Sequence, residues 1–139
     1  MSLEVRQIGL KCMPLVFSEV KDFIAEGLKD TDDCTAEDAK QYLERGDWQL
    51  FAAFNEDCKI KGVYVTTINH APTGKIAVII SAAGKGLASI EVFSQLCNKV
   101  KELGAVKIQA LAKESAVRLY KRVGFIEKAI LVEKKLWAE

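Results

Sequence analysis

The chain has 139 residues, of which half are apolar and 28% are charged, and its 20 basic and 19 acidic residues leave a formal net charge of +1. This mix is typical of one globular domain with a real core, and the balanced charge argues against a broad surface for nucleic acid or anionic lipid. No apolar run approaches the roughly 20 residues of a membrane span, so we expect neither nucleic acid nor a membrane as partner.

The first part of the chain predicts a strand and two helices. Apolar residues alternate over residues 3–8, which favours a strand, and they then recur at three- and four-residue steps over residues 14–28, which favours a helix. Thr35, followed by two acidic residues, is a helix-capping signal, and Gly46 is a natural stop. A second helix is therefore expected between them.

The middle of the chain predicts three consecutive strands. Residues 48–54 and 59–68 are rich in aromatic and β-branched side chains, and the turn residues 55–57 separate them. Residues 70–74 form a second expected turn. The run KIAVIISA at residues 75–82 is almost entirely apolar, which fits a strand covered on both faces.

The remaining segments predict a helix over residues 87–103, a strand over 106–111, a short helix over 114–123 and a final strand over 125–136. The order is β-α-α-β-β-β-α-β-α-β in one domain of residues 1–139. The fold class is α/β of the α+β type, with a mixed and mostly antiparallel sheet, because a strand–helix–strand unit implies one parallel pair.

A glycine-containing loop joins the apolar strand at 75–82 to the long helix. Its sequence, Ala-Gly-Lys-Gly-Leu-Ala at 83–88, lets the backbone approach a ligand closely, and the N–H groups of a first helical turn bind phosphate. Lys85 adds a positive charge beside such an anion. An ordinary turn explains the same residues equally well. The loop matches neither the Walker pattern nor the dinucleotide-binding pattern.

A second motif covers residues 114–125, Glu-Ser-Ala-Val-Arg-Leu-Tyr-Lys-Arg-Val-Gly-Phe. Taken alone, Ala116, Leu119, Tyr120 and Val123 are the buried face of a short helix, and Tyr120 is a core aromatic with a satisfied hydroxyl.

Together the two motifs resemble the GNAT N-acyltransferase superfamily over nearly the whole chain. The coenzyme A loop of that family reads R/Q-x-x-G-x-G/A, and residues 83–88 occupy its place with Gly86 and Ala88 at the two small positions. The later motif is similar to N-x-x-A-x-x-L-Y-x-x-x-G-F. It is matched by Ala116, Leu119, Tyr120, Gly124 and Phe125.

The resemblance implies an acetyltransferase that moves an acetyl group from acetyl-CoA to a primary amine of a small molecule or protein. It implies that the pantetheine lies along a strand and that the pyrophosphate lies on the glycine loop, with Tyr120 as the acid for the leaving thiolate. The cofactor-binding residues so implied are Val78, Ile79, Ile80, Gly84, Lys85, Gly86, Leu87, Ala88 and Ser115.

The departures from the family pattern keep a second reading open. Ala83 stands where the family has Arg or Gln, and Lys113 stands where Asn is common. No general base is evident, and His70 is better explained as a solvated turn residue. The alternative is a non-catalytic GNAT-like binding or structural module. The acidic stretch Asp30–Asp33 borders the acceptor site in the family, but a solvated loop explains it as well.

Cysteines occur at 12, 34, 58 and 97 with no C-x-x-C pair, so no metal site is predicted. The beginning of the sequence is charged too early for a signal peptide, and we therefore expect free thiols and a cytoplasmic protein. The basic residues near the end of the sequence are interleaved with acids, as on a solvated face. The sequence leaves a homodimer open.

Overall fold

The computed structural model describes residues 2–137; residues 1, 138 and 139, which belong to the predicted domain 1–139, lie outside the described range. The elements follow one another as β1 (Glu4–Gln7), a 3-10 turn (Leu10–Cys12), α1 (Met13–Leu28), α2 (Ala36–Arg45), β2 (Trp48–Phe54), β3 (Ile60–Ala71), β4 (Gly74–Gly84), α3 (Ile90–Glu102), β5 (Ala105–Ala110) and α4 (Glu114–Arg122).

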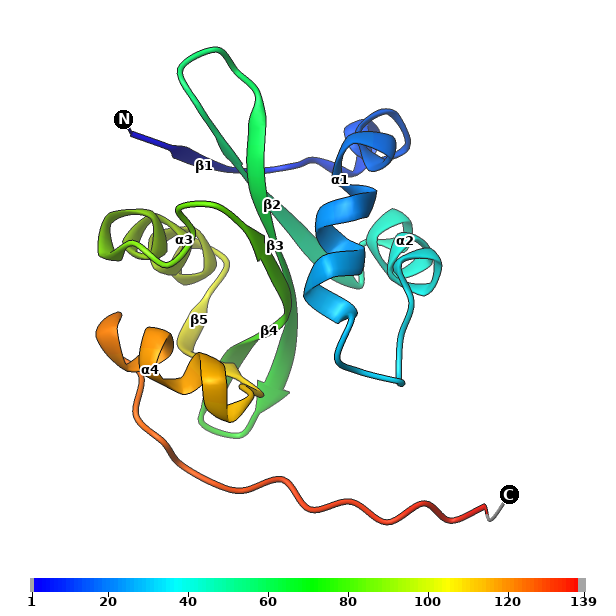
Figure 1. Ribbon diagram of the computed structural model, residues 1–139, viewed down its shortest axis with the longest axis vertical. Coiled ribbons are helices and arrows are strands. Elements are labelled where there is room, and N and C mark those ends of the chain that lie inside the picture. The colour runs from blue at the N-terminus through cyan, green and yellow to red at the C-terminus, as the bar shows by residue number, and fades with distance from the viewer. Residues whose placement is uncertain (1, 138–139) are drawn as a thin grey trace.

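The strands form one mixed sheet in the order β1-β2-β3-β4-β5 (Figure 1). The first three pairings are antiparallel, and β4 pairs with β5 in parallel. The predicted fold class is therefore confirmed, including the parallel pair across the α3 crossover.

Helices cover both faces of this sheet. In Figure 1, α1 and α2 lie on one side, and α3 and α4 lie on the other. Val20 and Ile24 of α1 are completely buried with Leu43 of α2 against one face. Phe93 and Leu96 of α3 pack against the other face. Within the described range, no helix is long and apolar enough to cross a bilayer.

Helix boundaries follow the predicted signals with small shifts. The capping box at Thr35 forms, because its hydroxyl accepts from the N–H of Asp38 while the Asp38 carboxylate accepts from the N–H of Thr35. The helix expected from Leu87 instead begins at Ile90, because Ser89 caps it by accepting from the N–H of Val92.

The turn expected at residues 70–74 is shorter than predicted. His70 pairs with Lys75 and Ala71 pairs with Gly74, so β3 and β4 are joined by the two residues Pro72 and Thr73. Gly74 has a φ of 135°, which few other residues adopt.

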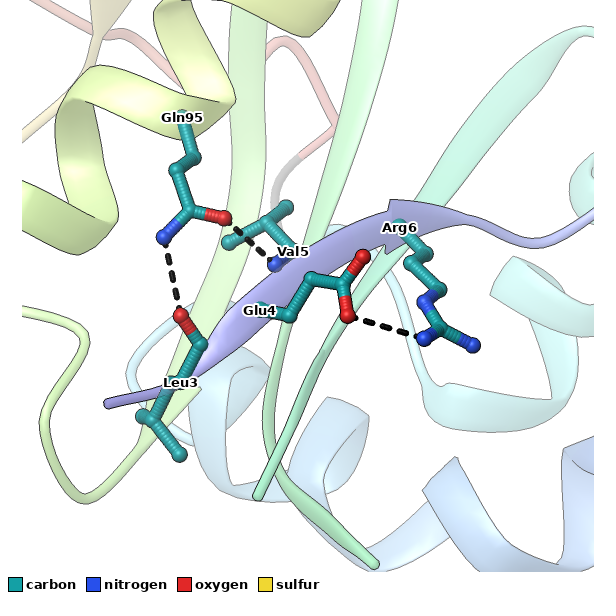
Figure 2. A network of polar contacts seen from close by, with 5 residues as sticks. All are labelled: Leu3, Glu4, Val5, Arg6 and Gln95. Atoms are coloured by element: carbon teal, nitrogen blue, oxygen red, sulfur yellow. Dashed lines mark hydrogen bonds and ion pairs between the residues drawn. The ribbon is translucent and has the colours of Figure 1, made fainter. Parts of the chain in front are cut away.

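A side chain of α3 occupies the free edge of β1 (Figure 2). The Gln95 amide oxygen accepts from the N–H of Val5 at 2.8 Å, and its nitrogen donates to the carbonyl oxygen of Leu3 at 2.8 Å. Gln95 thus satisfies the edge groups that a further strand would use.

The final strand predicted over residues 125–136 does not form. This segment leaves α4 without regular structure and extends away from the body of the molecule (Figure 1). We call it the C-terminal arm. Its alternation suits a strand, but a strand needs a neighbour to pair with, and β5, the last strand of the sheet, does not pair with the arm.

Candidate active site

The predicted glycine loop is a tight connection between β4 and α3. Gly84 and Gly86 have φ values of 129° and 87°, in the region that favours glycine. Gly84 also faces Gly62 of β3, and a Cβ at Gly84 would lie 2.3 Å from the Cα of Gly62. The backbone therefore requires glycine here for its own packing. Lys85, Gly86 and Ala88 are exposed, whereas Leu87 is buried in the core.

A buried tyrosine holds this loop in place. The Tyr64 hydroxyl of β3 donates to the carbonyl oxygen of Leu87 at 2.8 Å. Tyr64 is only 2% exposed, and burial raises the pKa of its phenol far above its ordinary value. The loop is thus fixed both by close glycine contacts and by a buried hydrogen bond.

The strands β4 and β5 part in the middle of β4. Their pairing runs from Lys75–Ala105 to Ile79–Ala110, while β4 continues to Gly84. At the same point β4 has a bulge, because Val65 and Thr66 of β3 pair with Ser81 and Ile79 and leave Ile80 between them without a partner. Bulges of this kind are common beside active sites, where they redirect side chains and end strand pairing.

The bulge reverses the alternation of side chains along β4. Ile79 packs in the cluster on the α3 side, whereas Ile80 packs against the cluster of α1 and α2. Ser81 also lies on the α1 side, since its hydroxyl donates to the carbonyl oxygen of Ile24 at 3.4 Å. Of the predicted pantetheine residues, Ile79 is buried, and Val78 and Ile80 are half-buried at the point where the strands part.

Tyr120 of α4 lies on the α3 side of the sheet. Its ring packs edge-on against Phe125 at 4.9 Å between centroids, and Phe125 packs against Phe93 at 5.3 Å. Tyr120 belongs to the surroundings of the cluster that contains Ile79 and Leu87. Burial raises the pKa of its phenol, so Tyr120 is protonated at neutral pH.

The positions that depart from the family pattern lie at the two borders of this region. Ala83 is only 9% exposed, and its carbonyl oxygen lies against Gly62. Lys113, at the N-terminal end of α4, forms an ion pair with Asp30 at 2.6 Å between Nζ and Oδ1. Ser115 is exposed in the first turn of the same helix.

The acidic loop between α1 and α2 is engaged by lysines of its own chain. Besides the pair of Asp30 and Lys113, Asp32 accepts an ion pair from Lys135 of the C-terminal arm, with 3.7 Å between Oδ2 and Nζ. The four side chains are between 47% and 78% exposed, and ion pairs that are this exposed contribute little to stability. These ion pairs nevertheless engage Asp30 and Asp32, two of the carboxylates that could attract a cationic acceptor according to the sequence.

His70 lies far from the parting of the strands. It pairs with Lys75 at the other end of β4, five residues and therefore about 16 Å along the strand from Ile80. There it lines an open hollow of about 320 Å³ together with Trp48 and Lys75. The position excludes His70 from a base role beside Ile80. Within residues 2–137, no three metal-ligating side chains come together.

Known proteins match this chain in structure but not in the sequence comparisons. No protein-family model matches the sequence, and no curated protein does. Solved structures do match. One is an aminoglycoside acetyltransferase from an uncultured soil metagenomic sample, in complex with sisomicin, with a TM-score of 0.70 at 14% identity over 99% of this chain and 97% of that chain.

Two other acetyltransferases match equally well. Glucosamine-6-phosphate N-acetyltransferase from Arabidopsis thaliana has a TM-score of 0.67 at 17% identity, covering 98% of this chain and 99% of its own. A predicted acetyltransferase with acetyl-CoA from Clostridium acetobutylicum has a TM-score of 0.69 at 18% identity, covering 96% of each chain. The chain has the GNAT fold.

Within the GNAT fold, the loop and Tyr120 are predicted by sequence motifs, whereas two other features of this region have no sequence signal. The bulge at Ile80 has no signal in KIAVIISA, which contains neither Gly nor Pro. Tyr64 sits in an ordinary strand sequence, and only its contact with Leu87, 23 residues away, gives it a role. The ligand roles of the ten predicted site residues stay predictions.

Proposed function

We propose that the chain is an N-acetyltransferase that passes an acetyl group directly from acetyl-CoA to a primary amine of a small molecule or protein. The observation that carries this proposal is the coincidence of the Ile80 bulge with the parting of β4 and β5, directly before the glycine loop. The GNAT fold and the acetyl-CoA named for one similar structure support it.

In this proposal β4 and the loop hold the donor. The pantetheine arm lies along Val78–Ile80 where β5 has moved away, and pairs with main-chain groups as a strand would. The pyrophosphate lies on the backbone N–H groups of residues 84–88, with Lys85 as a positive charge beside it. Ser115 lies at the start of α4 and is the remaining proposed contact.

The amine nitrogen attacks the thioester carbonyl carbon, an amide bond forms, and the C–S bond breaks to release the thiolate of coenzyme A. The amine loses one proton to solvent, and the thiolate gains one. A phenol with a raised pKa is a weaker acid than a thiol, whose ordinary pKa is about 8.5. The proposed role of Tyr120 is therefore to donate a hydrogen bond to the developing thiolate while it keeps its own proton, and the thiolate takes up from solvent the proton that the amine has lost.

A second candidate rests on Ala83. Its burial leaves no side chain to contact the pyrophosphate, and loss of one charged contact costs about 1.5–3 kcal/mol. This position favours a non-catalytic module that keeps the fold but does not bind the acyl donor. The four free thiols support a reducing compartment for either candidate, and we propose the cytoplasm.

Calorimetric titration of acetyl-CoA into the purified chain separates the two candidates. We expect micromolar binding that weakens about tenfold in Lys85→Ala, as loss of one exposed charged contact predicts. Binding only after Ala83→Arg would mean that the loop has lost its charge but not its shape. No binding by the wild type, in a protein whose circular dichroism shows the fold intact, would support the non-catalytic module whatever the buried Ala83→Arg variant does.

Turnover tests the role of Tyr120. With a panel of primary amines, release of coenzyme A should fall about 10²-fold or more in Tyr120→Phe, in the range of one lost hydrogen bond to a developing charge. Tyr42→Phe is the matched control, because Tyr42 stacks on Trp48 away from this region. Equal turnover by wild type and Tyr120→Phe would remove Tyr120 from the mechanism.

A further inference from the structure

The hollow of about 320 Å³ that His70 lines is built on the face of the sheet that α3 covers. Antiparallel partners share a face, and alternate residues of one strand do so too. Gln49 pairs with Thr66, and His70 pairs with Lys75, while Ile68 lies between Thr66 and His70 on β3. Ile68 packs against the cluster under α3, so these five side chains all belong to the α3 face.

Lys75 holds a positive charge at one end of this hollow. Its Nζ donates to the carbonyl oxygen of Leu103, the residue that follows α3, at 3.4 Å. Its side chain lies along Gly104, where a Cβ would meet the Lys75 Cδ at 3.3 Å. Among the ion pairs of residues 2–137, none involves Lys75. One N–H of the ammonium thus binds the backbone, and two remain for a ligand.

The other polar side chains of the lining add neutral hydrogen-bond donors. The completely buried Thr66 donates its hydroxyl to the Gln49 Oε1 at 2.9 Å, which leaves the Gln49 amide nitrogen as the group that faces a ligand. His70 lies beside Lys75, and a neutral imidazole carries one N–H. Gln7 contributes a second amide. None of the described residues that line the hollow is acidic.

The remaining large side chains of the lining are apolar. They include Ile8, Met13 and Leu103, together with Leu10, which is 55% exposed, and Trp48. Along β3 the hollow therefore changes from a positive charge at one end to an apolar surface in the middle. A volume of this size lies at the lower end of the range for small-molecule sites, which combine apolar walls with a few fixed polar groups.

We propose that this hollow binds a small organic carboxylate with an apolar body. The carboxylate accepts hydrogen bonds from Lys75 and His70, and the apolar body lies against Ile68 and Leu10. A role for Lys75 in capping α3 accounts for one of its three N–H groups and explains neither the lack of acidic residues nor the apolar wall. The site lies about 16 Å along β4 from Ile80, so it is separate from the proposed donor site.

Benzoate is the probe, and the fluorescence of Trp48 reports its binding. The chain has two tryptophans, so Trp137→Phe leaves Trp48, which lines the hollow, as the only one. We expect a saturable change in fluorescence with a dissociation constant of about 1 mM or below. Benzyl alcohol has the same ring without the charge and should bind about tenfold more weakly or less.

Lys75→Met removes the charge and keeps a long side chain. We expect it to weaken benzoate binding about tenfold or more, while circular dichroism shows the fold unchanged. Lys61→Met is the matched control, because Lys61 is also an exposed lysine of the β3–β4 hairpin but lies outside the hollow. His70→Leu provides the test if Lys75→Met fails to fold, with a several-fold loss expected.

Amide chemical shifts in the NMR spectrum locate the bound benzoate. We expect shifts at residues 48–49 and 67–75 and none at residues 84–88. Shifts confined to residues 84–88 would place benzoate in the proposed donor site and overturn the inference. Equal binding of benzyl alcohol, undiminished binding by Lys75→Met, or the same fluorescence change with sodium chloride would overturn it as well. None of these measurements uses acetyl-CoA, so their failure would leave the proposed acetyltransferase untouched.

Discussion

At the scale of single residues, the hydroxyl of Tyr64 has the largest consequence for the candidate site. It crosses from β3 to the loop before α3 and donates to the carbonyl oxygen of Leu87. Because the bond is buried, a lost hydroxyl leaves that carbonyl without water or another partner. Tyr64 is therefore a positioning residue for the loop, and it need not touch the donor.

Replacing Tyr64 by Phe separates this role from catalysis. We expect the free energy of unfolding to fall by about 1–3 kcal/mol, the cost of an unpaired buried acceptor. A loosened loop should raise the KM for acetyl-CoA several-fold while kcat stays near wild type. Thermal unfolding and steady-state kinetics measure the two effects. A variant that lost kcat and kept KM would place Tyr64 in the chemistry instead.

At the scale of elements, α1 fits against β4 at the point where the bulge has turned Ser81 toward it. Gly27 of α1 lies directly over this residue, and a Cβ at Gly27 would lie 1.9 Å from the Ser81 Oγ and 3.0 Å from the backbone nitrogen of Ala82. Glycine is normally a cost inside a helix, but here it permits the close approach of helix and strand.

Gly27→Ala should therefore destabilise the fold. Helix propensity alone predicts a gain of about 1 kcal/mol, but overpacking costs typically about 1–3 kcal/mol, and the backbone nitrogen of Ala82, 3.0 Å from the added Cβ, cannot rotate aside as the end of a side chain can. We expect a net loss of about 1–2 kcal/mol in chemical denaturation. Ser81→Ala should recover part of the loss, because it removes the closest atom.

Gly9→Ala is the matched control for this packing. A Cβ at Gly9 meets nothing within 4 Å, so the change should leave the free energy of unfolding within about 0.5 kcal/mol of wild type. If Gly27→Ala instead stabilised the protein, helix propensity would outweigh packing, and the contact between α1 and β4 would be looser than the structure has it.

The same scale separates what the sequence predicted from what it did not. Local signals placed the helices and the first five strands, because caps such as Thr35 and the period of the apolar residues act within a few positions. The prediction of a strand over residues 125–136 was wrong. The sequence pattern indicates only that the segment suits a strand, and it does not indicate a neighbouring strand with which the segment could pair.

The candidate site divides in the same way. Residues 83–88 and Tyr120 are predictions from motifs, that is, from short spacings along the chain. The bulge at Ile80 depends on the register between β3 and β4, and the role of Tyr64 depends on a contact across the sheet. No local pattern records either one, so they required the structure.

At the scale of the whole molecule, one sheet separates two apolar clusters of different character. The cluster under α1 and α2 holds aliphatic side chains together with Phe17. The cluster under α3 contains the phenol of Tyr64 and has Tyr120 at its border. Burial is the main cause that raises the pKa of both phenols, so both pKa values should return toward the ordinary value when the chain unfolds.

This arrangement predicts that stability decreases at alkaline pH. Below the ordinary phenol pKa of about 10, both groups are protonated in the folded and the unfolded chain, and their contribution is fully present. Above it the unfolded chain ionises first, because the folded chain holds the protons to higher pH. The free energy of unfolding should then fall by up to about 1.4 kcal/mol per pH unit for each phenol.

The difference in unfolding free energy between wild type and Tyr64→Phe isolates one of the two phenols, because the two proteins share every other titratable group and those contributions cancel in the subtraction. Urea denaturation at a series of pH values should give a constant difference below pH about 10 that shrinks above it, since only the wild type then carries the cost of keeping Tyr64 protonated. A difference that stayed constant through this range would mean that Tyr64 ionises alike in both states. The α3 face would in that case admit water at high pH, and the loop at Leu87 would open before the rest of the sheet unfolds.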